Sequence, residues 1–298
     1  MKKQYTVEKK MIPSAGKDIK ILILRPTTNA KPREHTPGIL WIHGGGYATG
    51  MAGMIYMSRA IDLVKKYGAV VVTPEYRLAG KAPYPAGLAD CYAALKYLKD
   101  HAEELGVNSS QIMVGGESAG GGLTAALCMY AKDKGEVNIA YQMPLYPMLD
   151  DQDTESSRDN HDISWNTSRN HAAWKLYLRR LKGRKEFAAA SENRNDLGND
   201  AVSQRAIPAY AAPARRKDYT GLPPAYTFVG EHEAFYCETL TYIDNLQKAG
   251  IPAHVDIYPT GLHAFDMLLP FHPMSKHAAQ IFEERYLYAA ENYFAEQD

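Results

Sequence analysis

A glycine-rich turn limits the possible folds of this chain more than any other feature. Residues 115–122 read GGESAGGG, and they directly follow a short apolar run at 111–114. Apolar residues then recur at helical spacing as far as Tyr130. The glycines on either side of Ser118 allow a tight turn without side-chain clashes. The segment therefore predicts a strand, a sharp turn and a helix in direct succession, with Ser118 at the turn.

Strand-like and helix-like segments alternate along most of the chain, which favours an α/β fold. Several strand-like runs are continuously apolar, as expected for strands that are covered on both faces. We therefore expect a mostly parallel central sheet of about eight strands with helices on both faces. The strand-like runs lie at 19–24, 38–42, 69–73, 112–114, 139–145, 226–229 and 255–258, and strand-like sequence also begins near Tyr5. Stretches in which apolar residues recur at helical spacing, called stripes below, lie at 54–64, 88–98, 123–130 and 240–246.

One long segment, residues 150–219, is polar and irregular and interrupts this alternation. It contains Trp165 and Trp174 among many charged residues, and its most basic part, residues 179–185, is interpreted as a solvated helix face. The segment is too long for an ordinary loop and too polar for a core element. We predict a single domain, residues 1–298, in which 150–219 forms an inserted partial cap.

The overall charge and the cysteine content exclude several classes of protein. The 298 residues include 34 Lys and Arg and 34 Asp and Glu, so the balance favours neither a nucleic-acid nor an anionic-membrane partner. Three cysteines without a C-x-x-C spacing predict neither a disulfide framework nor a metal site. No apolar run approaches the roughly 18 residues of a membrane-spanning helix. We expect a cytoplasmic protein without metal or cofactor.

Two glycine-containing motifs suggest acyl-transfer chemistry. Residues 116–120 form G-x-S-x-G, and the following helix directs its N-terminus at Ser118, which favours developing negative charge. Residues 43–47 read HGGGY after the run at 38–42, and such glycines can turn backbone N–H groups towards an oxyanion. A turn without chemistry, or a phosphate-binding loop, is the alternative for each motif alone. His43 is interpreted as a residue that positions the loop.

A general base and an acid are expected after the later strands. His263 lies in a loop just after the run at 255–258, where a base that activates Ser118 belongs. The acid should lie between the serine and the histidine, and the candidates there are Glu231 and Glu233. Either carboxylate could instead complement a helix dipole.

Taken together, these motifs resemble the hormone-sensitive-lipase-like family of α/β-hydrolases, from the strand before His43 almost to the C-terminus. The resemblance implies that Ser118 is the nucleophile and His263 the base. It also implies an oxyanion hole formed by backbone N–H groups. The matching segments are HGGGY at 43–47, EYRLA at 75–79, PA at 85–86 with Asp90, GESAGG at 116–121, PMLDD at 147–151, GLPPAY at 221–226 and HAF at 263–265, and the implied oxyanion donors are Gly45, Gly46 and Ala119.

The chain departs from the family pattern at the acid and at the cap. The family acid is usually an aspartate, and Glu233 falls on its position, with Glu231 and Asp256 as alternatives. Family members usually begin with helices that form part of the cap, whereas strand-like sequence begins here near Tyr5. We therefore expect either a more open acyl pocket or a cap completed by a partner subunit in a homodimer.

The resemblance implies an esterase that acts on small-molecule, short-chain acyl esters through an acyl-enzyme. An open site would also admit acetyl esters of carbohydrates. Two alternatives remain at this point. An amidase could use the same triad, and a non-catalytic ligand-binding protein could share the fold.

Overall fold

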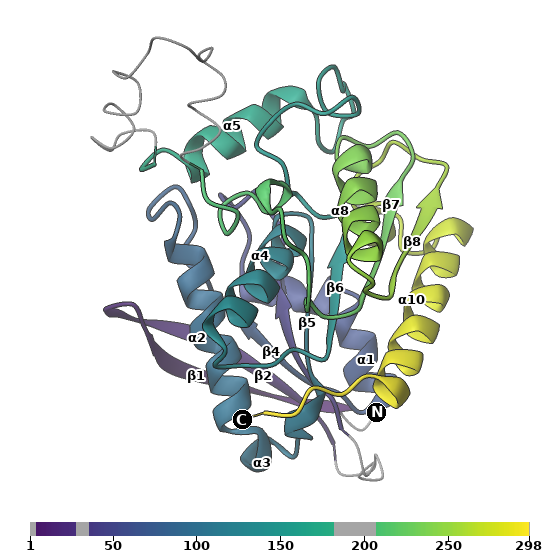
Figure 1. Cartoon of the computed structure of the whole chain (residues 1–298). Coiled ribbons are helices and arrows are strands. Elements are labelled where there is room, and N and C mark those ends of the chain that lie inside the picture. The colour runs from purple at the N-terminus through teal and green to yellow at the C-terminus, as the bar shows by residue number, and fades with distance from the viewer. Residues whose placement is uncertain (1–3, 28–35, 182–206, 298) are drawn as a thin grey trace.

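The computed structural model describes residues 4–27, 36–181 and 207–297, and a central sheet runs through its middle (Figure 1). The strands follow the order β1-β2-β4-β3-β5-β6-β7-β8. β1 and β4 each pair with β2 in antiparallel orientation, and all other neighbours are parallel. The expected eight-stranded, mostly parallel sheet is therefore confirmed. The strands are β1 Tyr5–Ser14, β2 Lys17–Pro26, β3 Gly38–Ile42, β4 Val70–Pro74, β5 Ile112–Glu117, β6 Tyr141–Leu145, β7 Ala225–Gly230 and β8 Ala253–Tyr258.

Helices cover both faces of the sheet, and the strands supply alternate side chains to each face. Leu40 packs with α2 and α4 on one face, whereas Ile39 and Trp41 pack with α1 and α10 on the other. α8 packs beside α4 through Leu246. The helices are η1 Ala52–Met57, α1 Ala60–Tyr67, α2 Ala86–Asp100, α3 Ala102–Leu105, η2 Ser109–Gln111, α4 Ala119–Lys134, α5 Thr167–Tyr177, η3 Pro213–Arg215, α8 Tyr236–Lys248, α9 Phe265–Leu268 and α10 Pro273–Asn292.

The prediction of one helix across the stripe at 54–64 is wrong. Ser58 adopts an extended conformation and separates η1 from α1, and its main-chain N–H and its hydroxyl both bind the Ile55 carbonyl. Met57 is largely exposed, whereas Ile61 and Val64 are buried as expected. A turn that satisfies its own backbone groups therefore interrupts an apolar spacing that by itself fits one helix.

Helix α10 has no counterpart among the predicted stripes. Its buried face is made mainly of Ala278, Phe282, Tyr286 and Ala289, in which alanine and tyrosine give a weak apolar signal. Within the described part of the chain, no helix combines the length and apolar character needed to cross a membrane.

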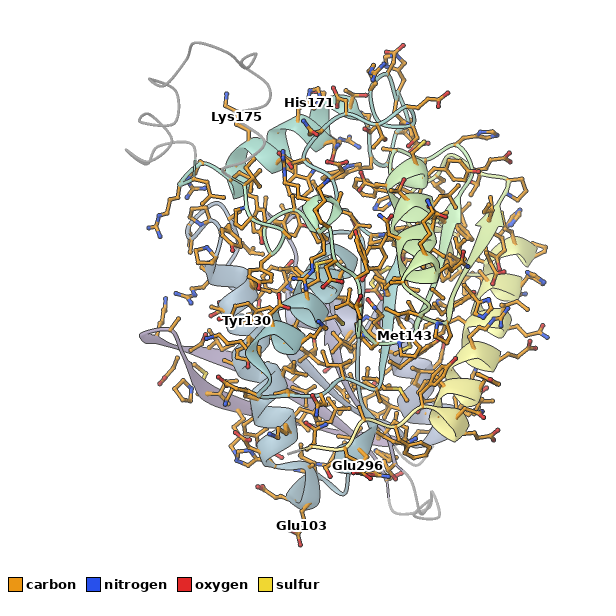
Figure 2. All side chains as sticks on the ribbon, viewed as in Figure 1. Glu103, Tyr130, Met143, His171, Lys175 and Glu296 are labelled. Carbon is orange, nitrogen blue, oxygen red and sulfur yellow. The ribbon has the colours of Figure 1, made fainter. Side chains whose placement is uncertain are left out.

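The carboxyl ends of the parallel strands face α5, which lies across that end of the molecule (Figure 1). Figure 2 shows His171 and Lys175 of α5 at the end opposite Glu103 of α3. We call residues 150–181 the α5 segment. The predicted cap, 150–219, includes residues 182–206, which lie outside the described residues, so the cap as a whole remains a prediction. In parallel α/β sheets, this carboxyl end is where ligands bind.

Candidate active site

Ser118 occupies a strained turn between β5 and α4. Its backbone angles are φ 57° and ψ −120°, a region that residues other than glycine seldom adopt. Hydrogen bonds hold it there: its N–H donates to the Leu145 carbonyl at 3.0 Å, and its carbonyl accepts from Gly122 at 2.9 Å and Met148 at 3.0 Å. The turn therefore projects the Ser118 hydroxyl beyond the end of β5, where it can meet groups from other loops.

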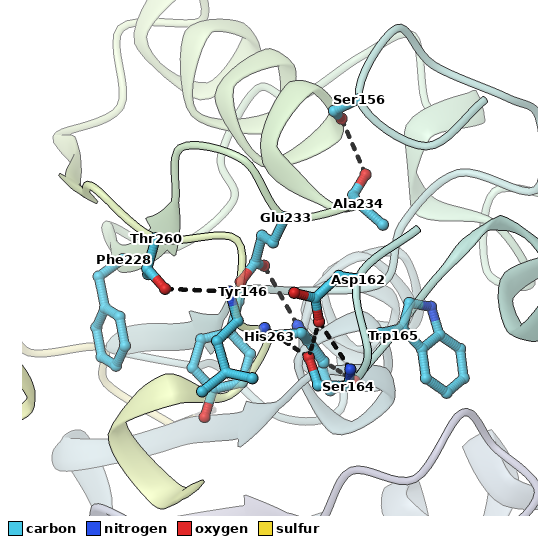
Figure 3. Close-up of polar contacts among 12 residues, drawn as sticks. Tyr146, Ser156, Asp162, Ser164, Trp165, Phe228, Glu233, Ala234, Thr260 and His263 are labelled. Atoms are coloured by element: carbon cyan, nitrogen blue, oxygen red, sulfur yellow. Dashed lines mark hydrogen bonds and ion pairs between the residues drawn. The ribbon is translucent and has the colours of Figure 1, made fainter. Parts of the chain in front are cut away.

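The structure brings Ser118, His263 and Glu233 together from three separate loops (Figure 3 shows the histidine and the glutamate). His263 Nε2 lies 2.8 Å from Ser118 Oγ, and His263 Nδ1 lies 3.3 Å from Glu233 Oε1. All three side chains are buried. Burial raises the pKa of the Glu233 carboxyl, and the adjacent His263 opposes that rise. In this arrangement the carboxylate can orient the imidazole, and the imidazole can take the serine proton.

The two alternative acids lie elsewhere. Glu231 is exposed to solvent, and its main-chain N–H donates to the Tyr258 carbonyl of β8. Asp256 lies within β8 and accepts a 2.7 Å hydrogen bond from the Tyr226 hydroxyl. Of the three carboxylates considered, Glu233 is the one that contacts His263.

The glycines after β3 lie against the Ser118 turn. A Cβ on Gly44 would lie 3.2 Å from the Ser118 Cβ and 2.9 Å from the Glu117 carbonyl oxygen, so only glycine allows this approach. Gly45 and Gly46 adopt positive φ angles of 115° and 58°. Within the described chain, no protein acceptor takes a hydrogen bond from either of their N–H groups. In general, a backbone N–H group without a protein acceptor can bind a developing oxyanion.

His43 supports this glycine loop. The side chain is buried, its Nδ1 lies 2.8 Å from the Gly44 carbonyl oxygen, and its ring stacks on Tyr76 at a centroid distance of 4.2 Å. The Tyr76 hydroxyl donates to the His43 carbonyl at 3.1 Å. Burial lowers the pKa of His43, which favours a neutral ring. These contacts place His43 against the glycine loop, and its positioning role stays a prediction.

Three aromatic rings surround His263, and the motifs did not identify them. Tyr146, Phe235 and Trp165 lie with ring centroids 5.1, 4.9 and 6.2 Å from the imidazole. Trp165 also covers the glycine loop, because a Cβ on Gly46 would lie only 2.5 Å from its indole. The rings come from three segments that are distant in sequence, so periodicity could not bring them together.

A buried polar cluster lies behind the site. The Tyr146 hydroxyl donates to Asp266 at 2.9 Å, and Arg59 forms an ion pair with the same carboxylate at 3.2 Å. Next to the nucleophile, the buried Glu117 accepts a 2.9 Å hydrogen bond from the Trp41 indole N–H. Burial raises the pKa of Glu117 to about 8, so its carboxyl is largely protonated at neutral pH.

Side chains of the α5 segment form hydrogen bonds with loops elsewhere in the chain. Arg179 donates to the carbonyl oxygens of Ala79 and Gly80, so the described start of the basic run makes structural contacts. Residues 182–185 of that run lie outside the described residues. Asn160 donates to the His232 carbonyl at 3.1 Å, beside the loop that carries the acid.

Among residues 4–27, 36–181 and 207–297, no group of three or more His, Cys, Asp or Glu side chains is placed so that it could hold a metal ion. Cys91 and Cys128 are buried, Cys237 is partly buried, and all three are free thiols.

Comparison with known proteins identifies the family. A model of the α/β-hydrolase fold family matches residues 39–267. The chain belongs to this family. It is 29% identical to the carboxylesterase NlhH of Mycobacterium tuberculosis over 78% of this chain and 67% of that protein. It is 30% identical to the esterase LipI of the same species, over 77% of this chain and 65% of that one. The chain thus spans about two thirds of the length of these relatives.

Solved structures agree with this assignment. The hydrolase superposes on a bacterial heroin esterase with a TM-score of 0.80 and 32% identity, covering 93% of this chain and 82% of that one. It superposes on the esterase LipW of Mycobacterium marinum with a TM-score of 0.79 and 26% identity, covering 96% and 82% of the two chains. The α/β-hydrolase fold and the carboxylesterase class of enzyme, both expected from the sequence, are confirmed.

Proposed function

We propose that this hydrolase cleaves short-chain carboxylic esters through a Ser118–His263–Glu233 triad. The observation that carries the proposal is the continuous contact from the Ser118 hydroxyl to the His263 imidazole and on to the buried Glu233 carboxylate. Esterase relatives support the same chemistry. The proposed oxyanion donors are the main-chain N–H groups of Gly45, Gly46 and Ala119, at the end of β3 and the start of α4.

The first half of the proposed reaction acylates the enzyme. His263 Nε2 takes the hydroxyl proton as Ser118 Oγ attacks the ester carbonyl carbon. The negative charge that develops on the carbonyl oxygen is stabilised by the oxyanion donors, and Glu233 stabilises the imidazolium. His263 then returns its proton to the alcohol oxygen, the ester C–O bond breaks, and the acyl group remains on Ser118.

The second half of the reaction restores the free serine. His263 takes a proton from a water molecule, whose oxygen attacks the acyl carbon. The same donors stabilise the second oxyanion, and collapse of the intermediate returns the proton to Ser118 and releases the carboxylic acid. In this proposal, the same residues serve both steps.

The preference for short acyl chains is supported by Trp165. Its indole lies over Gly46 and near His263, so it occupies space beside the carbonyl binding position. A small acyl group needs less of that space than a long chain. Acetylated sugars are small-acyl esters with a bulky alcohol, and they belong in the same substrate test.

The test measures kcat/KM on 4-nitrophenyl esters from ethanoate to hexadecanoate, together with acetylated sugars. We expect butanoate to exceed hexadecanoate at least ~10-fold, and Ser118→Ala to abolish turnover with thermal stability close to wild type. Digestion of a quenched reaction should yield the Ser118 peptide carrying the acyl group. A preference for hexadecanoate would contradict the short-chain proposal, and turnover by Ser118→Ala would contradict the choice of nucleophile.

A further inference from the structure

The main chain of His263 is bound by a residue of the α5 segment. The His263 backbone N–H donates a 2.9 Å hydrogen bond to Ser164 Oγ (Figure 3). Ser164 lies just before Trp165, whose ring covers the glycine loop and approaches the His263 imidazole. The same short stretch of the α5 segment therefore contacts both the backbone and the side-chain surroundings of the candidate base.

Asp162 fixes the orientation of the Ser164 hydroxyl. The hydroxyl donates to Asp162 Oδ1, and the Ser164 main-chain N–H donates to the same oxygen at 2.7 Å. Because the hydroxyl proton is directed at a carboxylate, an oxygen lone pair is left to accept from His263. The other carboxylate oxygen lies 3.5 Å from the position of a Cβ on Gly261, within the loop that carries His263.

The loop that carries His263 has a strained backbone that its surroundings hold in place. Ala264, the next residue, adopts a left-handed conformation with φ 59°, which for alanine persists only where the surroundings impose it. Before the histidine, Leu262 N–H binds Thr260 Oγ1 at 3.0 Å, and the Thr260 carbonyl accepts from His232 at 3.0 Å. These contacts hold the loop as far as Leu262, and the Ser164 contact holds the histidine itself.

We propose that Ser164 is a positioning residue for the general base, and that Asp162 acts through it. The inference rests on the proposed role of His263. Ser164 fixes the His263 main chain, so that Nε2 stays within hydrogen-bond distance of Ser118 and Nδ1 stays beside Glu233. Folding of the α5 segment onto the sheet therefore completes the catalytic geometry as well as covering the site.

The main test is Ser164→Ala, with Ser164→Thr as the variant that keeps the acceptor oxygen. We expect Ser164→Ala to lower kcat ~10-fold at an almost unchanged KM, because small displacements of reacting groups affect the rate more than binding. Labelling of Ser118 by a small fluorophosphonate should slow by a similar factor, since it depends on the same base. Ser164→Thr should restore most of both rates.

A double-mutant cycle tests the role of Asp162. Asp162→Ala should lower kcat ~3-fold to ~10-fold in the wild-type background and have little further effect in Ser164→Ala, because coupled residues are not additive. The matched control is Thr167→Val. It removes a hydroxyl that bonds the Ser157 and Asn160 carbonyls within the same segment. This control should leave kcat within twofold of wild type.

The outcomes separate this inference from the proposed function. Retained activity in His263→Ala would overturn the proposed base, and with it the inference. Loss of activity in His263→Ala with a wild-type kcat in Ser164→Ala would overturn the inference alone. So would an equal fall of kcat in Thr167→Val, or a failure of Ser164→Thr to recover, because either result would mean general loosening of the segment. Thermal melting of every variant identifies any loss of folding.

Discussion

Replacing Glu233 by glutamine tests the least conventional part of the site. The variant keeps the side-chain volume and an oxygen that can accept from His263, but it removes the negative charge. Glu233 Oε1 lies 3.3 Å from His263 Nδ1, and the Glu233 side chain is fully buried. At an effective dielectric constant of about 20, unit charges at that separation attract by about 5 kcal/mol. That interaction exists only while the imidazole is charged, so its loss falls on the transition state.

The expected result is a fall in kcat of about three to four powers of ten, since about 1.4 kcal/mol corresponds to a factor of ten. The assay is steady-state hydrolysis of 4-nitrophenyl butanoate, with thermal melting to verify folding. Glu231→Gln is the matched control, because Glu231 is the same residue type two positions earlier and exposed to solvent. A loss below tenfold in Glu233→Gln, or an equal loss in Glu231→Gln, would refute the assignment of Glu233 as the acid.

Two further predictions concern acyl length and pH. Trp165→Ala should raise the ratio of octanoate to butanoate kcat/KM by at least ~10-fold, because removing the indole opens space beside Gly46; an unchanged ratio in the ester series would contradict this role. The free energy of unfolding of Glu117→Gln, relative to that of wild type, should increase as pH rises. The protonated Glu117 stabilises the fold fully below about pH 4.5, and this contribution is lost as pH rises through its pKa of about 8. Urea unfolding at pH 5.5, 7 and 8.5 should therefore show a difference that grows by at most about 1.4 kcal/mol per pH unit, and a pH-independent difference would contradict the buried, neutral state of Glu117.

The sheet was largely predictable because its signals are local. The continuously apolar runs correspond to strands buried on both faces, and the glycine-rich turn correctly placed Ser118 between β5 and α4. Prediction failed where two local signals conflicted and where the apolar signal was weak. The stripe at 54–64 was interrupted at Ser58, and the alanine- and tyrosine-rich face of α10 gave too little contrast to be recognised.

The choice of the site residues and the contacts between them rest on different kinds of information. Chain order and motif position selected Ser118, Glu233 and His263, and the structure brings these three side chains into contact. Composition and spacing could not rank Glu233 above Glu231, because both precede the same helix. Burial and direction distinguish them: one carboxylate faces His263 and the other faces solvent.

The positions of most strands along the chain, the serine turn and the family resemblance could be read from the sequence, because these depend on short-range periodicity and on glycines at fixed positions. The contacts of the α5 segment, in contrast, emerged from the folded structure. Its polar, irregular sequence has no period that would indicate a buried face, yet Trp165 covers Gly46 and Ser164 binds the His263 main chain. Both contacts join residues far apart in the chain, so they exist only once the segment has folded over the carboxyl ends of the strands.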